Sequence, residues 1–177
     1  MSTITTFTGE NFDPLNPNVQ QINIEDIAHA LSLMCRANGH IIRFFSVAQH
    51  ALNCSVEAAG RGYSQKVQLA CLLHDASEAY LSDITRPIKR HLPAYVQAEK
   101  KLQDIIYDKF LQSPLSEEEY AQVQGVDDDM LEAEFVALMP VRVAKRSVQL
   151  HTSPSYAFCS FDAVESEFIM AFNRLRE

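Results

Sequence analysis

Residues 72–80, LLHDASEAY, carry an imidazole and two carboxylates within five positions, at His74, Asp75 and Glu78. They overlap the end of an apolar run at residues 67–73. An unpaired buried charge is very costly, so ionisable groups at the end of a buried helix need a partner, and a divalent metal is the simplest one. Imidazole and carboxylate are both good ligands for such metals, and helical spacing puts Glu78 on the same side as His74 and Asp75. The plainer alternative is a core His74 that Asp75 merely orients.

A second histidine, His50, precedes His74 by 24 residues. Ser46 and Gln49 match a capping box, in which each side chain bonds the other residue's backbone, and this box opens the helix that carries His50. A glycine-containing turn at residues 60–62 follows, so two antiparallel helices can bring His50 against His74. A single histidine on a helix is usually structural, and the interest of His50 rests on this pairing.

Three consecutive aspartates, Asp127, Asp128 and Asp129, follow Gly125. The simplest interpretation is negative charge at the start of a helix after a break at the glycine. An inward face is nevertheless predicted at Val126, Met130, Ala133 and Ala137. Asp127 borders that face together with Glu134, so it is the aspartate best placed to reach the interior, and Asp128 and Asp129 are expected to face water.

Composition bounds the class of protein. The 177 residues suit one domain, with 47% hydrophobic and 21% charged residues. The net charge of −8 and the pI near 5.2 argue against binding a nucleic acid polymer, which needs a basic face. No apolar run approaches the roughly 18 residues of a membrane helix, and the N-terminus does not resemble a secretory signal. Four cysteines without a CxxC pair read as small core residues, and a cytoplasmic location is expected.

The hydrophobic spacing along the whole chain predicts an all-α fold of at least six helices in a single domain, residues 1–177. Residues 1–22 read as an irregular arm packed through Phe7, Phe12 and Leu15. Residues 24–139 form the helical core that carries the motifs, and residues 141–177 a loop and a C-terminal helix. The predicted helices span residues 24–36, 47–60, 65–80, 93–111, 116–139 and 162–176. Their expected caps are Asn23, Ser46, Ser64, Ser116 with Glu119, and Asp162 with Glu165.

The order His50, then His74-Asp75, then Asp127 resembles the H…HD…D signature of the HD-domain phosphohydrolases. The resemblance includes SVAQH around His50, LLHDASEAYLSDITRPIK around His74, and LEAE after the aspartates. It covers roughly residues 24–139 and is closest to the bacterial branch of 5′-nucleotidase-like HD proteins, in which an arginine precedes the first histidine as Arg36 does here.

This resemblance implies an HD-domain helical bundle with one divalent metal ion, which can be Mn, Co, Fe, Ni, Zn or Mg. The implied ligands are His50, His74, Asp75 and Asp127. Glu78 is expected to position or deprotonate the attacking water, and Asp83 to transfer a proton or orient the substrate. Arg36 and Lys89 are the cations expected against the phosphate.

The implied activity is removal of phosphate from a small phosphomonoester, most plausibly a nucleoside monophosphate. Related nucleotidases carry a bulky aromatic directly after the arginine, whereas this chain has Ala37, so selectivity for deoxyribose is left open. The alternatives are a phosphodiesterase, a nucleoside-polyphosphate hydrolase, or a non-catalytic module that binds metal and nucleotide. The remaining histidines suggest no second metal set, which favours one metal; they are His29, His40, His91 and His151. A homodimer is left open.

Overall fold

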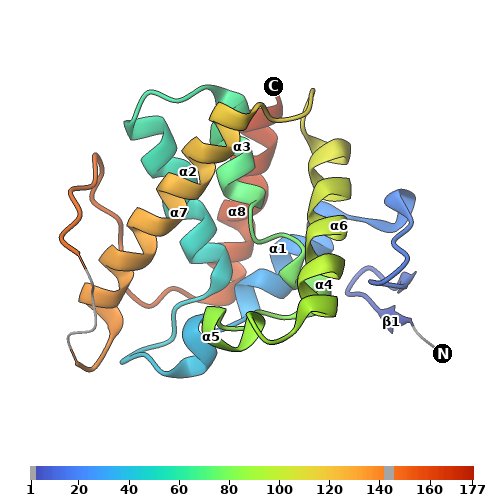
Figure 1. Cartoon of the computed structure of the whole chain (residues 1–177), viewed down its shortest axis with the longest axis horizontal. Helices are drawn as coiled ribbons and strands as arrows, with labels where there is room; N and C mark the ends of the chain where they lie inside the picture. The colour runs from blue at the N-terminus through green and yellow to red at the C-terminus, as the bar shows by residue number, and fades with distance from the viewer. Residues whose placement is uncertain (1–2, 142–145) are drawn as a thin grey trace.

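The structure, a computed structural model, describes residues 3–141 and 146–177, and it is mostly helical, as the sequence predicts (Figure 1). The helices are α1 (Ile24–Leu33), α2 (Val47–Gly60), α3 (Gln65–Leu73), α4 (Glu78–Leu81), α5 (Arg86–Lys89), α6 (Pro93–Phe110), α7 (Glu117–Leu138) and α8 (Phe161–Arg176). No helix within the described ranges is long and apolar enough to cross a lipid bilayer.

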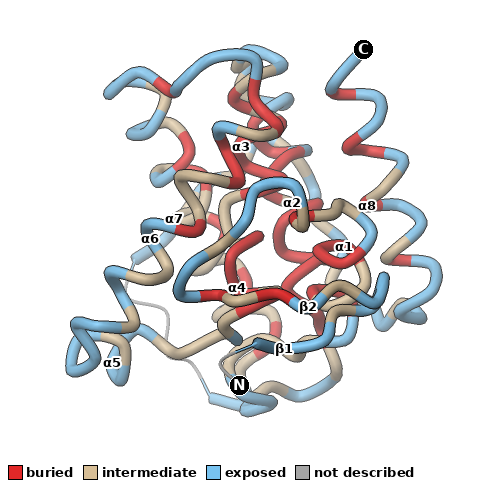
Figure 2. The backbone as a smooth tube through the Cα atoms, turned by 90° about the vertical axis from the view of Figure 1, so that its right-hand side faces the viewer, coloured by how far each residue is buried: buried red, intermediate tan, exposed pale blue. Residues whose placement is uncertain are grey.

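The centre of the fold is a layer of packed helices in which α2 contacts α3, α7 and α8. The turn at residues 61–64 reverses the chain, so α2 and α3 run in opposite directions (Figure 1). The hydrophobic core of the fold includes large, fully buried side chains such as Leu72, Met130 and Phe168. Burying one such side chain contributes roughly 1.5–3 kcal/mol. Figure 2 shows that buried backbone gathers in α1 to α4, whereas α5 and the outer faces of α6 and α8 meet solvent.

The N-terminal arm differs from the irregular segment that the sequence suggests. Two short strands, β1 (Ile4–Thr5) and β2 (Asn11–Phe12), pair antiparallel, and a 3₁₀ turn follows at Val19–Gln21. Phe12 is fully buried and its ring lies 4.4 Å from the Tyr80 ring. Phe7 stacks on His29 but is 61% exposed, and Leu15 is 58% exposed, so Phe12 alone of the three predicted anchors is buried. The arm is ordered because Asp26, at the start of α1, accepts hydrogen bonds from both the amide and the hydroxyl of Thr8.

Two predicted helix ends also need correction. Helix α1 ends at Leu33 rather than residue 36, because the amide of Arg36 bonds the carbonyl of Phe45 and a 3₁₀ turn follows at Arg36–Gly39. Asn23 is the N-cap residue, but its side chain bonds Thr8 instead of capping the helix. Helix α8 begins at Phe161, and Ser160 rather than the expected Asp162 is its N-cap residue, because the hydroxyl of Ser160 accepts a hydrogen bond from the amide of Ala163.

The predicted helix at residues 65–80 is interrupted at the motif itself. Helix α3 ends at Leu73, and the amides of Ala76 and Glu78 bond carbonyls three residues back, so the chain tightens before α4. Gln103 of α6 satisfies the backbone at this break: its amide nitrogen donates to the carbonyl of Leu73, and its oxygen accepts the amide of Ser77. The local sequence does not reveal a partner that lies 30 residues away.

Helix α7 runs unbroken from Glu117 to Leu138, which agrees with the helix predicted over residues 116–139 and excludes the alternative of a break at Gly125. Both predicted capping boxes form, with Ser46 and Gln49 opening α2 and Ser116 and Glu119 opening α7. The described residues between α7 and α8 have no regular structure, as predicted, and residues 142–145 of that loop lie outside the described part of the chain.

Candidate metal site

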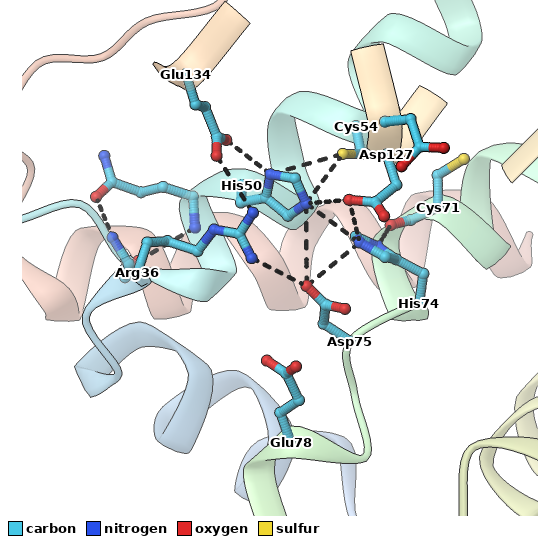
Figure 3. A network of polar contacts seen from close by, with 12 residues as sticks. Arg36, His50, Cys54, Cys71, His74, Asp75, Glu78, Asp127 and Glu134 are labelled. Carbon is cyan, nitrogen blue, oxygen red and sulfur yellow. Dashed lines mark hydrogen bonds and ion pairs between the residues drawn. The ribbon is translucent and has the colours of Figure 1, made fainter. Parts of the chain in front are cut away.

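Four donor atoms from three different parts of the helical core converge on one point (Figure 3). The Nε2 atoms of His50 in α2 and His74 after α3 lie 3.2 Å apart. Oδ1 of Asp127 in α7 lies 3.1 Å and 3.6 Å from those two nitrogens. Oδ2 of Asp75 lies 3.9 Å and 3.3 Å from the same pair. Ligands that share one metal ion at about 2.1 Å stand about 3.0–3.4 Å from each other, so this set is close to coordination spacing.

The hydrogen bonds on the far sides of the two rings determine which nitrogen faces the cluster. Nδ1 of His74 lies 2.7 Å from the carbonyl of Cys71, and because a carbonyl can only accept, this nitrogen carries a proton. Nδ1 of His50 lies 2.7 Å from the Glu134 carboxylate and donates in the same way. In the neutral tautomers both Nε2 atoms are therefore bare acceptors that face carboxylate oxygens, and only a proton or a cation can satisfy all four groups at once.

The titration of these groups reflects the same arrangement. Burial opposes charge on the His74 ring, but the negative charges of Asp75 and Asp127 outweigh it and hold the pKa of His74 well above its ordinary value. Burial likewise opposes ionisation of Asp127, yet hydrogen bonds from His50 and His74 in their protonated forms keep its pKa well below the usual range. The site thus attracts positive charge at its centre.

Each of the four groups is also held from outside. Besides the Glu134 and Cys71 contacts of the histidines, Asp75 Oδ2 lies 3.5 Å from Arg36, and Asp127 Oδ2 lies 2.7 Å from Arg86. Metal ligands are typically oriented by such outer partners. The Arg86 guanidinium also bonds Asp128 at 2.8 Å.

A thiol that the sequence predicts only as a core residue also lies close to the two histidines. His50, Cys54 and His74 place ligand atoms within 4.8 Å of one another, a group that can hold a metal ion. Cys54 lies one turn after His50, and its sulfur is 3.6 Å from His50 Nε2. Burial, followed by the charges of Asp127 and Glu134, raises the pKa of Cys54 well above the ordinary value. Because the thiolate is the form that binds metal, the carboxylates are the better partners for the histidines.

Glu78 lies beside the cluster without joining it. Its side chain is buried and points toward Asp75 (Figure 3). Oε1 is 3.6 Å from the Lys89 ammonium, and Oε2 has no hydrogen-bond partner in the described structure. Burial, and then repulsion from Asp75 and Asp83, raises the pKa of Glu78 well above its usual value. A buried carboxyl oxygen with no partner is costly and indicates a group that meets a ligand or water.

A cavity of about 600 Å³ opens next to these groups. Asp75, Glu78 and Asp127 line one end, and Ile41, Leu131, Phe135 and Leu138 contribute apolar surface. Arg36 and Lys89, both expected near a phosphate, line this cavity, and so does Asp83. Six of its lining residues are acidic against four basic ones, so the walls alone carry excess negative charge. Burial raises the pKa of Asp83, with Asp75 adding to the effect.

The structure brings together every residue that the sequence singled out for the site, and it separates the three aspartates. Asp127 faces the histidines, whereas Asp128 bonds Arg86 and Asp129 bonds Arg61 at 2.8 Å and also Arg146. The expectation that Asp129 simply faces water is therefore wrong, because two arginines partner it. Glu134 and Arg86 were not assigned to the site, although Glu134 lies two helical turns after Asp127, a spacing that could have indicated a shared face.

No known family profile matches the chain. It is 44% identical over 110 residues to the uncharacterized protein YfdR of Escherichia coli, covering 62% of this chain and 59% of that protein. It is 35% identical over 108 residues to an uncharacterized protein of Rhodobacter capsulatus, covering 58% of this chain and 55% of that one. The match thus spans a little more than half the length of these curated relatives.

Proposed function

We propose that the chain is a metal-dependent phosphohydrolase that removes phosphate from a small phosphomonoester, with a nucleoside monophosphate as the leading substrate. The observation that carries this proposal is the convergence of two bare imidazole nitrogens and two carboxylate oxygens at 3.1–3.9 Å, with no donor among them in the neutral tautomers. We assign His50, His74, Asp75 and Asp127 as the ligands of one divalent ion. The resemblance to HD-domain phosphohydrolases supports the same assignment.

The fit of a divalent ion rests on charge as well as geometry. The cavity walls hold more acidic than basic residues, and two of the acids face the same point as the two bare imidazole nitrogens. Nitrogen and oxygen donors in this mixture suit Mn, Co, Fe, Ni, Zn or Mg. Such an ion would supply Lewis-acid activation of a water molecule and of a phosphoryl oxygen.

The side chains around this point can perform the remaining steps. Arg36, whose contacts to Asp75 and Glu134 are long at 3.5 Å and 3.3 Å, can turn its free N–H donors to a phosphate in the cavity. Glu78, with its unpartnered Oε2, can accept the proton of the attacking water. Lys89 lies against Glu78 and can stabilise the carboxylate form, and Asp83 lines the cavity where it can return a proton to the leaving oxygen.

The unpartnered oxygen of Glu78 favours an enzyme over a module that only binds metal and nucleotide, because binding alone does not require a buried base. The size of the cavity accommodates an organic group as well as phosphate. Ala37 lines it in place of an aromatic, which leaves room beside the sugar, so we expect ribo- and deoxyribonucleotides to be cleaved with similar efficiency.

The decisive experiment is phosphate release from a panel of substrates after chelator treatment, with and without Mn²⁺, Co²⁺ or Mg²⁺. The panel holds ribo- and deoxyribonucleoside 5′-monophosphates, a phosphodiester and nucleoside triphosphates. We expect monophosphates to release phosphate only when metal is restored. Activity confined to the diester or the triphosphates would favour the phosphodiesterase or polyphosphate-hydrolase alternative. Metal binding without turnover of any substrate would favour the regulatory module.

A further inference from the structure

We infer that Glu134 is a positioning residue that orients the ligand His50 and restrains Arg36. A single carboxylate then links the metal site to the arginine that is proposed to bind phosphate. This inference rests on the proposed function. Glu134 is 3% exposed, and each of its oxygens has its own partner: Oε1 lies 2.7 Å from Nδ1 of His50, and Oε2 lies 3.3 Å from the Arg36 guanidinium. Figure 3 shows the carboxylate between these two side chains.

The first role follows from the His50 ring. His50 is fully buried, and the hydrogen bond to Glu134 fixes the proton on Nδ1, which leaves Nε2 bare toward His74 and Asp127. Without this acceptor the ring can carry its proton on Nε2 instead, because Asp127 Oδ1 lies 3.1 Å from Nε2 and can accept that hydrogen bond. That tautomer cannot bind a metal through Nε2, so loss of the acceptor should weaken metal binding.

The second role follows from competition for one oxygen. Oδ2 of Asp75 faces both the His74 nitrogen at 3.3 Å and the Arg36 guanidinium at 3.5 Å. Glu134 holds Arg36 from the other side at 3.3 Å. If the charge of Glu134 is removed, Asp75 becomes the stronger of the two attractions, and Arg36 should close on the oxygen that the metal needs. Glu134 therefore keeps a cation near the site without letting it occupy the site.

The test measures Co²⁺ affinity by titration calorimetry on the full-length protein, and therefore does not depend on activity. Glu134→Ala should weaken Co²⁺ binding by about 10–100-fold, the usual effect of losing an outer partner of a ligand. Glu134→Gln keeps an acceptor for His50 and should lose less. Asp129→Asn is the matched control, because this carboxylate lies on the same helix and is also paired with an arginine, Arg61, outside the metal cluster. It should bind Co²⁺ as the wild type does.

A second measurement isolates the link to Arg36. The loss of Co²⁺ affinity caused by Glu134→Gln should be smaller in the Arg36→Ala background, because the competing guanidinium is then absent. Equal losses in both backgrounds would overturn the link, and unchanged affinity in Glu134→Ala would overturn the orienting role. If Glu134→Ala does not fold, the Gln variant in the two backgrounds still decides the question. A wild type that binds no Co²⁺ would instead overturn the proposed function together with this inference.

Discussion

The two oxygens of Asp127 face different partners. Oδ1 lies toward His50 and His74, and Oδ2 bonds the exposed Arg86 at 2.7 Å. We expect Asp127→Asn to lose bound metal, since the amide cannot provide the charge that a divalent ion requires at this position. Asp128→Asn and Asp129→Asn should retain it, because these two carboxylates bond arginines and do not face the histidines. Elemental analysis of the purified variants measures this, and equal metal content in all three would remove Asp127 from the ligand set.

Substitution of Glu78 should lower turnover without removing the bound metal. Its carboxyl lies beside the cluster rather than within it, and Oε2 is unpartnered. Glu78→Gln keeps the shape and removes the base, so we expect full metal occupancy and a kcat that is lower by about 10²–10⁴-fold on a phosphomonoester. Glu118→Gln, on the exposed first turn of α7, is the control and should behave as the wild type. A Glu78→Gln variant with unchanged kcat would transfer the role of base to Asp83.

The residues of the cluster were predictable to different degrees. His74 and Asp75 could be identified from the sequence because ionisable residues are unusual at the end of an apolar run. The position of His50 on a helix could be predicted from the capping box that opens that helix. Arg86 carries no local signal, and Glu134 carries only its spacing from Asp127, since each gains its role from partners on another element. Cys54 reads correctly as a buried core residue, and only the fold shows that its sulfur lies near the His50 ring.

At the scale of elements, two helical glycines have opposite surroundings. A Cβ added at Gly60, the last residue of α2, would lie 2.6 Å from Cγ2 of Thr152, whereas one added at Gly125 in α7 meets nothing within 4 Å. We expect Gly125→Ala to stabilise the protein by about 0.5–1 kcal/mol, because alanine lowers the entropy cost of the helix. Gly60→Ala should destabilise it instead, because Thr152 must move. Urea unfolding of the two variants compares them directly, and a stabilised Gly60→Ala would contradict the close packing of this loop.

The loop before α8 is attached to α2 by Gln49 and Asn53, which donate to loop carbonyls, and by the buried carboxylate of Glu57. Glu57 accepts hydrogen bonds from the amides of His151 and Thr152, from the Thr152 hydroxyl and from Arg61. Burial opposes its ionisation, but these donors lower the pKa of Glu57 to about 2. Because the folded state holds the carboxylate at a lower pKa than the unfolded chain, whose value is about 4.3, its stabilising contribution is complete above that unfolded value and is lost as the pH falls toward 2.

This linkage gives a measurable pH dependence. The free energy of unfolding of the wild type should exceed that of Glu57→Gln at pH 7, and the difference should shrink between about pH 4.3 and pH 2. Urea unfolding at pH 7, 5 and 3 measures both proteins under matched conditions. A difference that stays constant down to pH 3 would mean that the carboxylate charge does not hold the loop.

Helix starts were predicted correctly where they depend only on interactions between neighbouring residues, as in the two capping boxes. Both capping boxes open the helices they were expected to open, because the bonds that form them lie within four residues. The interruption after Leu73 could not be predicted, because Gln103 of another helix satisfies the freed backbone groups. A break at Gly125 was the simpler interpretation of the three aspartates, but α7 continues through the glycine and has tertiary support on both sides of it, from the buried Val123 and Val126. Tertiary packing therefore overrides the weak preference of one residue.

At the scale of the whole molecule, the four donors tie together parts of the chain that are far apart in sequence. His50 belongs to α2, His74 and Asp75 follow α3, and Asp127 belongs to α7. A cation at this point would thus join the three packed helices of the core, and it would relieve the repulsion among carboxylates in a chain of net charge −8. Binding that occurs only in the folded state must stabilise that state.

Metal removal should accordingly lower the melting temperature of the entire protein rather than loosen one loop. At a free metal concentration 100 times Kd the folded state gains about 2.7 kcal/mol, which for a chain of this size corresponds to roughly 5–11 °C. We expect Mn²⁺ or Co²⁺ to raise the melting temperature of chelator-treated protein by an amount in this range, and Asp127→Asn to show no such rise. Scanning calorimetry with matched metal and chelator buffers makes the comparison. An equal rise in wild type and Asp127→Asn would place the stabilising cation elsewhere on this acidic surface, because the variant lacks one of the four groups that hold it.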